Sequence, residues 1–332
     1  MEDLSQINEQ TRLVQSYKDR SKKFKLSKRA RDYIFVILML LYPVLQFALI
    51  WSFVNIQSVL NAFRQTDVVT GNVNYGLQNF IDYFTNLFNN PSHANGTTWI
   101  NDTAIVLLNS LAIGIITVFV SLPLSLLSAY FLHKKMPFAN VFRAIFFLPN
   151  IIPVVALTFA FKTAIDGNFG YLYDFFIWLG MPDAFIVKTP YGIIVLIIYL
   201  IWAGLGYNII FISGAIGRIP KELFESAQLD HAGYFKEFVH VVIPCIWPTV
   251  VTLIIVGMTN VLTLYLQPML LVGTDFPAVY TISLEIFLSA KSGATSKYES
   301  AAAFGLLMSA IWAPVIIISR KLLSKKYQGV DY

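Results

Sequence analysis

The sequence predicts an all-α polytopic membrane protein with six transmembrane helices. Of its 332 residues, 56% are hydrophobic and 13% are charged, whereas a soluble globular chain carries about 25% charged residues. Six stretches contain no Asp, Glu, Lys or Arg, and each supplies roughly the twenty helical residues that a bilayer core of about 30 Å requires. These stretches are residues 33–63, 103–132, 144–161, 189–217, 241–274 and 300–319. A soluble fold of six buried helices would need a charged surface that this composition does not supply.

Basic residues are distributed unevenly among the segments that separate these stretches. If the amino terminus is cytoplasmic, 19 of the 24 Lys and Arg residues fall on the cytoplasmic side and 5 on the other. Cytoplasmic loops of membrane proteins carry such an excess of Lys and Arg. Both termini are therefore expected in the cytoplasm. The basic run at 22–31 lies directly before the first apolar stretch, which favours membrane anchoring over nucleic-acid binding.

Each apolar stretch predicts one helix. The first is expected at about 32–55 and is followed by an outward loop at 56–102, rich in Asn, Gly and Ser. Four aromatic residues in that loop are spaced like one face of a short amphipathic helix: Phe80, Tyr83, Phe84 and Phe88. The remaining helices are expected at about 104–131, 142–162, 190–214, 247–270 and 300–322. Prolines within several of them fit bent helices around a solute path as well as they fit ordinary membrane-helix composition.

The cytoplasmic stretch between the fourth and fifth helices is longer than a simple turn. From Pro220 to Phe235 it has the pattern of an amphipathic helix, with a proline suited to the first turn and acidic residues near the amino-terminal end. Gly233 is a helix-stop signal, after which a second short helix is expected. We therefore expect a helix lying across the cytoplasmic face of the membrane. Its apolar side would contain Leu223, Phe224, Ala227 and Phe235.

The same stretch contains a recognisable order of small, acidic and apolar residues. In sequence it is Glu225, Ser226, Ala227, Asp230, Ala232, Phe238, Ile243, Pro244 and Pro248. This order resembles the EAA loop, here about 218–244, of binding-protein-dependent ABC importers. The closest branch is the carbohydrate permease family, with members of the maltose and glycerol-phosphate type. Four further segments are similar to that branch, and with the loop they cover about 104–323: residues 147–150, 202–208, 219–223 and 298–303.

Three features depart from the family pattern. Ser226 stands where the family usually has Ala, which is a mild steric change. His231 stands where the family usually has Gly, so a titratable side chain is expected at a tight bend. The Gly-rich run that follows the fifth span in the family is reduced here to residues 272–277.

The resemblance implies the type I permease fold of ABC importers, with a cytoplasmic EAA coupling helix, in a bacterial inner membrane. The domains would be a basic cytoplasmic segment at 1–31, a first transmembrane helix with its outward loop at 32–103, a core permease domain at 104–323 and a cytoplasmic tail at 324–332. In this family the EAA helix sits in a cleft of a cytoplasmic ATPase subunit. The residues expected at that contact are Leu223, Phe224, Glu225, Ser226, Ala227, Asp230, Ala232 and Gly233.

The resemblance also indicates where a solute would pass. Related permeases place their sugar contacts on the fourth and fifth spans, at positions that correspond here to Ala203, Gly204, Tyr207, Gly257 and Asn260. Trp202 and Asn208 add an aromatic and an amide group to the same region, and such groups suit the C–H faces and hydroxyls of a sugar. Further polar candidates on the fifth span are Thr259, Thr263, Tyr265 and Gln267. Packing between helices, or between two permease subunits, is the alternative role for all of these groups.

The function that the resemblance implies is that of a permease subunit in an ATP-driven importer for a sugar or oligosaccharide. Its partners would be a second permease subunit, commonly a different chain, a cytoplasmic ATPase dimer, an extracytoplasmic solute-binding protein and the bilayer, without nucleic acid. The chain has no phosphate-binding loop of the Walker type, so ATP and Mg are expected on the ATPase. No catalytic residue, metal site or cofactor is expected in this chain.

Three other functions are alternatives to this one. A non-sugar cargo for the same kind of importer stays open. An ion-coupled secondary transporter would need ionisable groups within its spans, and the charge-free stretches argue against it. An intramembrane enzyme would need a catalytic constellation there, and the spacing of the four histidines supplies none. The single cysteine, Cys245, excludes an internal disulfide.

Overall fold

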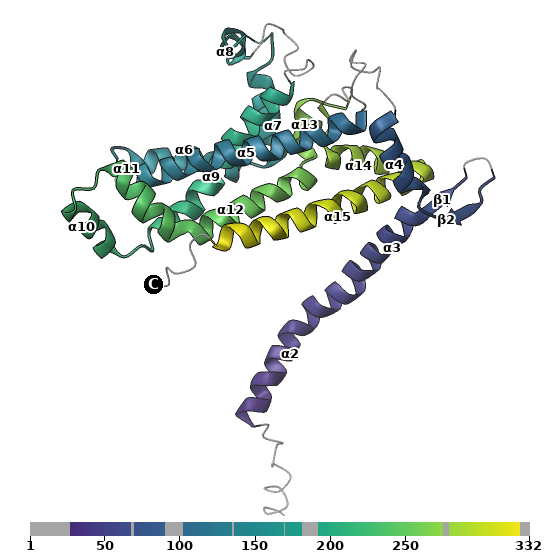
Figure 1. Cartoon of the computed structure of the whole chain (residues 1–332), viewed down its shortest axis with the longest axis horizontal. Coiled ribbons are helices and arrows are strands. Elements are labelled where there is room, and N and C mark those ends of the chain that lie inside the picture. Colours follow the sequence, from purple (N-terminus) through teal and green to yellow (C-terminus); the bar gives the residue numbers. More distant parts are fainter. Residues whose placement is uncertain are drawn as a thin grey trace, which may run out of the picture. The chain divides into compact units, whose positions relative to one another are not determined.

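The computed structural model divides the chain into two compact units, one over residues 1–58 and one over 59–332. Among the residues that the structure describes, the elements are helical except for one small hairpin (Figure 1). The residues that the structure describes are 27–67, 70–89, 102–134, 136–168, 170–180, 192–274 and 279–325.

The described part of the first unit, from residue 28 onward, is a continuous run of helix. It contains α2 (Lys28–Gln46), a π-helical turn η1 (Phe47–Trp51) and the beginning of α3 (Ser52–Phe63). The widened turn follows Pro43, which removes one backbone donor inside α2. Helix continues to Phe63, so the end predicted near residue 55 is wrong. No glycine or proline lies between Pro43 and Gly71, so neither of the two strongest helix-breaking residue types interrupts the helix near residue 55.

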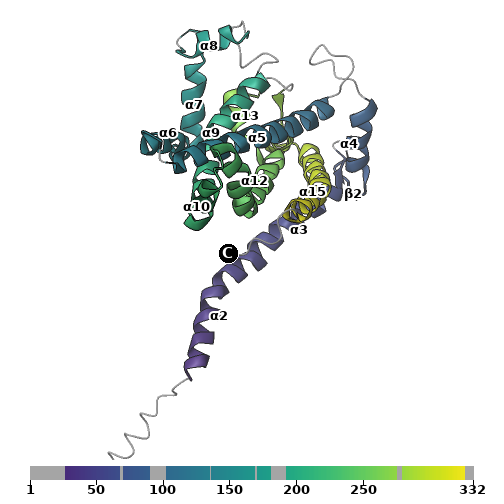
Figure 2. The same ribbon diagram turned by 60° about the vertical axis from the view of Figure 1, so that its left-hand side comes forward.

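Four long apolar helices form the centre of the second unit. α5 packs along α9, and α12 packs against α5, α9 and α15. Figures 1 and 2 both show these helices side by side. Buried apolar side chains fill these contacts, as van der Waals packing between membrane helices requires. The bounds of α5, α9 and α15 agree with the predicted helices to within about five residues. The four helices are α5 (Asp102–His133), α9 (Gly192–Ile216), α12 (Ile243–Thr263) and α15 (Thr295–Ser324).

Within the described ranges, five helical segments are long and apolar enough to cross a bilayer. A sixth crossing would have to combine α6 (Ala139–Ile151) with α7 (Val154–Ala164), and these two helices meet at 108°. The one helix predicted at 142–162 is therefore two helices that meet at a bend. Pro153 disfavours the helical conformation of the residue before it, and Ile152 accordingly has ψ of 133°. The break follows from this local restriction.

The fifth predicted helix is displaced toward the amino terminus. Helical structure runs from α11 (Tyr234–Glu237) through a π-helical turn, η3 (Phe238–Val242), to the end of α12, instead of over 247–270. Leu264 is extended, with φ of −82° and ψ of 102°, and the short helix α13 (Leu266–Leu271) follows it. The second short helix expected after Gly233 therefore forms the first turns of a long membrane-type helix.

A β-hairpin follows α3, and the all-α expectation is wrong at this point. β1 (Arg64–Thr66) pairs antiparallel with β2 (Val73–Tyr75). Gly71 supplies the positive φ of 68° that the turn requires. Glu299 of α15 is 2% exposed and holds the hairpin. Its carboxylate accepts from the backbone N–H of Thr66 at 2.9 Å and from the hydroxyl of that residue at 2.6 Å, and Nε of Arg64 lies 3.1 Å away.

The helix α4 (Gln78–Asn89) comes next and confirms the amphipathic helix predicted around Phe80 to Phe88. Its Tyr83 ring stacks on Phe304 of α15, with ring centres 4.6 Å apart. Burial, and then the charge of Glu285, raise the pKa of Tyr83 to about 12, so the phenol that packs there is neutral. Three further helices complete the unit: α8 (Tyr173–Trp178), α10 (Lys221–Leu229) and α14 (Ile282–Lys291).

Candidate functional site

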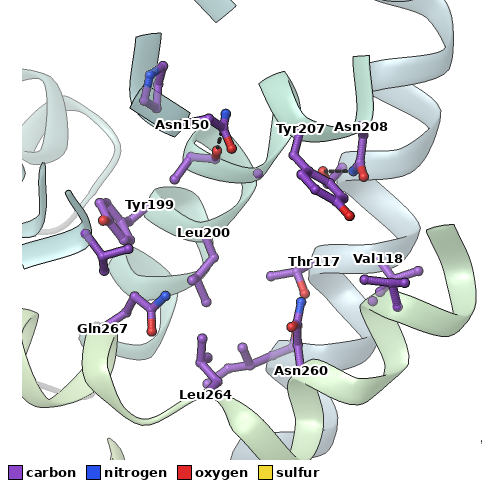
Figure 3. A pocket seen from close by; sticks show the side chains of 18 of the residues that line it. Thr117, Val118, Asn150, Tyr199, Leu200, Tyr207, Asn208, Asn260, Leu264 and Gln267 are labelled. Atoms are coloured by element: carbon purple, nitrogen blue, oxygen red, sulfur yellow. Dashed lines mark hydrogen bonds between the residues drawn. The ribbon is translucent and has the colours of Figure 1, made fainter. Parts of the chain in front are cut away.

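A cavity of about 380 Å³ lies among α5, α6, α7, α9, α12 and α13 (Figure 3). Apolar side chains form much of its wall, and hydroxyl and amide groups interrupt them. The polar lining residues are Thr117, Ser121, Asn150, Tyr199, Tyr207, Asn208, Asn260 and Gln267. Among the described residues that line it, none is Asp, Glu, Lys, Arg or His. The cavity therefore presents hydrogen-bonding groups and aromatic rings without a formal charge.

Six of the seven residues predicted for a solute path line this cavity. They are Ala203, Gly204, Tyr207, Asn208, Gly257 and Asn260. The four on α9 are spaced so that they share one face of the helix. Trp202 lies on a different face and does not line the cavity; its ring centre is 5.9 Å from that of Phe161 and 6.2 Å from that of Tyr199.

Of the other polar candidates on the fifth predicted span, one lines the cavity and the others do not. Gln267 lines the cavity from α13. Thr259 and Thr263 do not, and their hydroxyls donate to carbonyls of their own helix at 2.6 and 3.1 Å. Sequence reasoning did not assign Thr117, Ser121, Asn150 or Tyr199 to the path. The Pro149-Asn150 pair was part of the family resemblance, and that signal could have pointed to Asn150.

Two hydrogen bonds fix amide groups at the cavity wall (Figure 3). Asn208 Nδ2 donates to Ser121 Oγ at 3.1 Å and joins α9 to α5. Asn150 Nδ2 donates to the carbonyl of Ala203 at 3.3 Å and joins α6 to α9. Each bond uses one of the two N–H groups of the amide, so both side chains retain capacity for a further partner.

Two glycines allow helices to approach closely at this wall. A Cβ placed on Gly257 would lie 2.4 Å from Cγ2 of Val118 on α5, and one on Gly206 would lie 2.0 Å from the carbonyl oxygen of Phe146 on α6. Gly204 differs, because the nearest atom to its Cβ would be Ser121 Oγ at 3.8 Å. Gly257 therefore serves helix packing in addition to lining the cavity.

The EAA-like order forms a short helix and a tight turn. α10 ends at Leu229, and His231 has φ of 53°, a left-handed conformation that favours glycine. The helix predicted to run to Phe235 is therefore wrong. Ala232 donates from its backbone to the carbonyl of Ala227 at 2.9 Å, which closes the helix in the way a glycine cap does. His231 thus stands where the family usually has glycine, and the left-handed backbone conformation at this position is one that favours glycine.

The apolar side of α10 faces its own chain. Ala227 is buried, and Leu223 and Phe224 pack against the core cluster formed by α5, α9, η3 and α12. Leu223 and Phe224 are only half-buried, so each keeps part of its surface accessible, and the docking face expected at these three residues stays a prediction. Ala232 is half-buried. The exposed members of the predicted set are Glu225, Ser226, Asp230 and Gly233.

Three large apolar side chains beside these exposed residues were not predicted as contacts. Leu229 is 80% exposed, Tyr234 is 71% exposed and Phe235 is 75% exposed. They surround the turn at His231. An outward surface of the segment 221–237 therefore combines these three side chains with Glu225 and Asp230, and we call it the α10–α11 surface.

A buried ion pair beside this segment was also missed. Glu237 of α11 is 2% exposed, and its Oε1 lies 2.6 Å from Nζ of Lys134, the residue that follows α5. Such a distant pair leaves no pattern in the sequence. Among the residues that the structure describes, no three His, Cys, Asp or Glu side chains are placed to hold a metal ion.

Comparisons with known proteins agree with this architecture. The chain is 24% identical over 307 residues to the arabinooligosaccharides transport system permease protein AraP of Bacillus subtilis (strain 168), covering 91% of each. It is 27% identical over 186 residues to the diacetylchitobiose uptake system permease protein NgcF of Streptomyces coelicolor, covering 52% of this chain and 50% of that one. A crystal structure of a bacterial alginate ABC transporter, in complex with an alginate pentasaccharide-bound periplasmic protein, matches with a TM-score of 0.74 at 20% identity. That match covers 90% of this chain and 96% of the other.

The family model for the "binding-protein-dependent transport system inner membrane component" matches residues 121–328, well over half of the chain. The family named from the EAA-like order is thereby confirmed. The matched family is a transport component, which confirms that the chain is not itself an enzyme. With several membrane-type helices, the protein is a multi-pass membrane protein. The chain belongs to the family of inner membrane components of binding-protein-dependent transport systems.

Proposed function

We propose that this chain is a permease subunit of an ATP-driven importer and forms half of the path for a sugar or oligosaccharide. An extracytoplasmic binding protein would deliver the cargo. The observation that carries this proposal is the uncharged cavity, where six of the seven residues expected from sugar permeases lie together. Relatives named for arabinooligosaccharides and diacetylchitobiose support the same class of cargo.

The chemistry of the cavity favours a neutral oligosaccharide. Tyrosine rings offer apolar faces to the C–H groups of a sugar, and amide and hydroxyl groups offer partners to its hydroxyls. An acidic sugar would be expected to meet Lys or Arg, and the described lining contains neither. The same lining holds no carboxylate or imidazole that could bind a coupling ion, which argues against a secondary transporter.

A second permease subunit would complete the cavity. Tyr207 is 42% exposed and Asn260 is also exposed, although both line the cavity. Exposed polar and aromatic groups at mid-span would face either lipid or a partner, and lipid is the unfavourable choice. A partner chain that covers these groups would turn the open wall into an enclosed path.

The α10–α11 surface is the proposed contact with a cytoplasmic ATPase, which would bind the ATP and Mg. Exposed aromatic and leucine side chains are typical anchors of an interface, and acidic residues at the rim give orientation toward a basic partner. Leu229, Tyr234 and Phe235 would be the anchors, with Glu225 and Asp230 at the rim. In this proposal α10 lies in the cytoplasm, which is also the side that the distribution of basic residues predicts for it and for both termini.

Substitutions at the cavity test the path. Tyr207→Ala and Asn260→Ala are expected to lower oligosaccharide uptake at least tenfold at equal amounts of assembled transporter. Trp202→Ala is the matched control, because Trp202 lies on the same helix but not at the cavity. Uptake lowered as much by the control as by the two cavity variants would contradict the assignment.

A charge reversal tests the ATPase contact. Glu225→Lys is expected to reduce co-purification of the ATPase and to abolish uptake, while the amount of this chain in the membrane stays normal. Asp174→Lys makes the same change of charge at an exposed residue of α8 and is expected to leave both unchanged. Normal uptake by the Glu225→Lys transporter would refute the contact.

A further inference from the structure

Lys134 lies where three segments of the chain meet. It follows the last residue of α5, and its Nζ is 2.6 Å from Oε1 of Glu237 on α11. The same Nζ lies 5.2 Å from the ring centre of Phe224 on α10 and 5.8 Å from that of Tyr234 on α11. One ammonium group thus contacts the end of α5, the helix α10 and the helix α11.

Neighbouring groups reinforce this junction. The hydroxyl of Tyr130, on α5, is 3.1 Å from Oε1 of Glu237 and 3.1 Å from the carbonyl oxygen of Tyr234. The ring of His133 stacks on that of Phe224, with centres 5.4 Å apart. A buried carboxylate that loses its cation is strongly unfavourable, so Glu237 and Lys134 resist separation more than apolar contacts would.

The junction connects α10 to a helix that is distant in the sequence, whereas the other connections of α10 run through the backbone. The backbone itself joins α10 to α9 on one side and to α11, η3 and α12 on the other. α5 is remote in sequence and reaches the segment through side chains. Yet α5 supplies Thr117, Val118, Ser121 and Leu122 to the cavity wall. At 1.5 Å per helical residue, Ser121 is about 20 Å from Lys134 along α5.

We propose that Lys134 and Glu237 are positioning residues that fasten the α10–α11 segment to the end of α5, so that a displacement of this segment is delivered to the cavity wall. The inference rests on the proposed function, in which the α10–α11 surface contacts the ATPase. α9 and α12 would receive the displacement through the backbone, and α5 receives it through this junction. Three of the helices that carry cavity residues, α5, α9 and α12, then move together.

A distance measurement tests the junction in the assembled transporter. Spin labels on Phe131→Cys of α5 and Lys236→Cys of α11, both at exposed positions, report the separation of the two elements. We expect the same separation without nucleotide and after trapping the ATPase with Mg-ATP and vanadate. A separation that differs between these two states in the otherwise unaltered protein would overturn the proposal, because the segments would not be fastened.

A double substitution then removes the junction without leaving a buried charge unpaired. In Lys134→Met with Glu237→Gln, the two states are expected to show different separations, and arabinotriose uptake per ATP hydrolysed is expected to fall at least fivefold. Lys291→Met is the matched control, because Lys291 also lies over an aromatic ring, that of Phe287 at 5.9 Å, at the end of α14. An unchanged separation in the double variant would also overturn the proposal.

The two hypotheses fail in different ways. If the α10–α11 surface does not contact the ATPase, Glu225→Lys leaves co-purification of the ATPase intact, whatever the spin labels report. If only the junction is unimportant, Glu225→Lys still releases the ATPase, while the double variant keeps both its separation and its uptake per ATP.

Discussion

The side-chain amide of Asn208 donates to the hydroxyl of Ser121 over 3.1 Å, and this bond joins α9 to α5 at the wall of the cavity. Asn208 therefore serves helix packing, and in the proposed path the same amide would also contact a solute. Interhelical hydrogen bonds of this kind contribute about 0.6 kcal/mol on average. Loss of the bond alone should be a small effect.

Single alanine substitutions separate these two roles. Ser121→Ala and Asn208→Ala both break the bond, and both are expected to lower the unfolding temperature of the transporter slightly and equally. Asn208→Ala also removes the amide from the cavity, so oligosaccharide uptake should fall at least fivefold further than with Ser121→Ala. Near-normal uptake by the Asn208→Ala transporter at matched protein levels would assign Asn208 to packing alone.

Gly257 of α12 and Val118 of α5 make a second close contact between helices. We expect substitutions at this contact to change the stability of the protein. Gly257→Ala would place a Cβ 2.4 Å from Val118 Cγ2, and overpacking of this kind costs about 1–3 kcal/mol. Thermal unfolding in nanodiscs should show the loss, and Val118→Ala should restore stability. Gly204→Ala serves as the control, because its methyl group meets no atom closer than 3.8 Å. A Gly257→Ala protein as stable as the Gly204→Ala protein would argue against the close contact.

His231 has φ of 53° at the turn after α10, and its substitutions should follow that backbone conformation. A left-handed conformation costs an ordinary residue about 1–2 kcal/mol. His231→Gly should therefore keep or raise the unfolding temperature, whereas His231→Val should lower it, because a β-branched residue is a poor occupant of this region. Differential scanning fluorimetry of both variants provides the comparison. A valine variant that matches the glycine variant would mean that the turn is not left-handed.

Glu299 holds the β-hairpin to α15 through Thr66 and Arg64. Glu299→Ala removes a buried acceptor of two hydrogen bonds and is expected to lower stability by about 2 kcal/mol. Limited proteolysis should then cut the hairpin faster than in the unaltered protein. Glu299→Gln keeps an acceptor for Thr66, so its cleavage rate should lie between the two. Cleavage at the same rate in all three proteins would show that Glu299 does not hold the hairpin.

Long, charge-free helices were predictable from the sequence because their length and composition are local properties. The predicted helix at 104–131 became α5, Asp102–His133, and the one at 190–214 became α9, Gly192–Ile216. Three cavity residues on α9 were also predictable, since the family resemblance supplied Ala203, Gly204 and Tyr207. The choice of polar and aromatic groups at mid-span added Asn208, which lines the cavity, and Trp202, which the helix turns away from it.

Other features depend on information that no local pattern contains. The break at Ile152 arises from the proline after it, although proline also occurs within continuous helices such as α5. Each strand of the hairpin has only three residues and β1 is entirely polar, so composition predicted a loop. The apolar residues of α10 were expected to face a partner, because amphipathicity shows that one side is covered but not by what. The Lys134–Glu237 pair depends on where α5 ends in space.

Uptake by proteoliposomes that contain the complete transporter tests the central claim most directly. The vesicles would hold this chain, its partner permease and the ATPase, with the loaded binding protein on the side opposite the ATPase. We predict that a labelled oligosaccharide accumulates only when hydrolysable ATP is present on the ATPase side, and that Glu225→Lys abolishes this accumulation. Equal accumulation without ATP, driven by a proton or sodium gradient, would contradict the assignment of this chain to an ATP-driven importer.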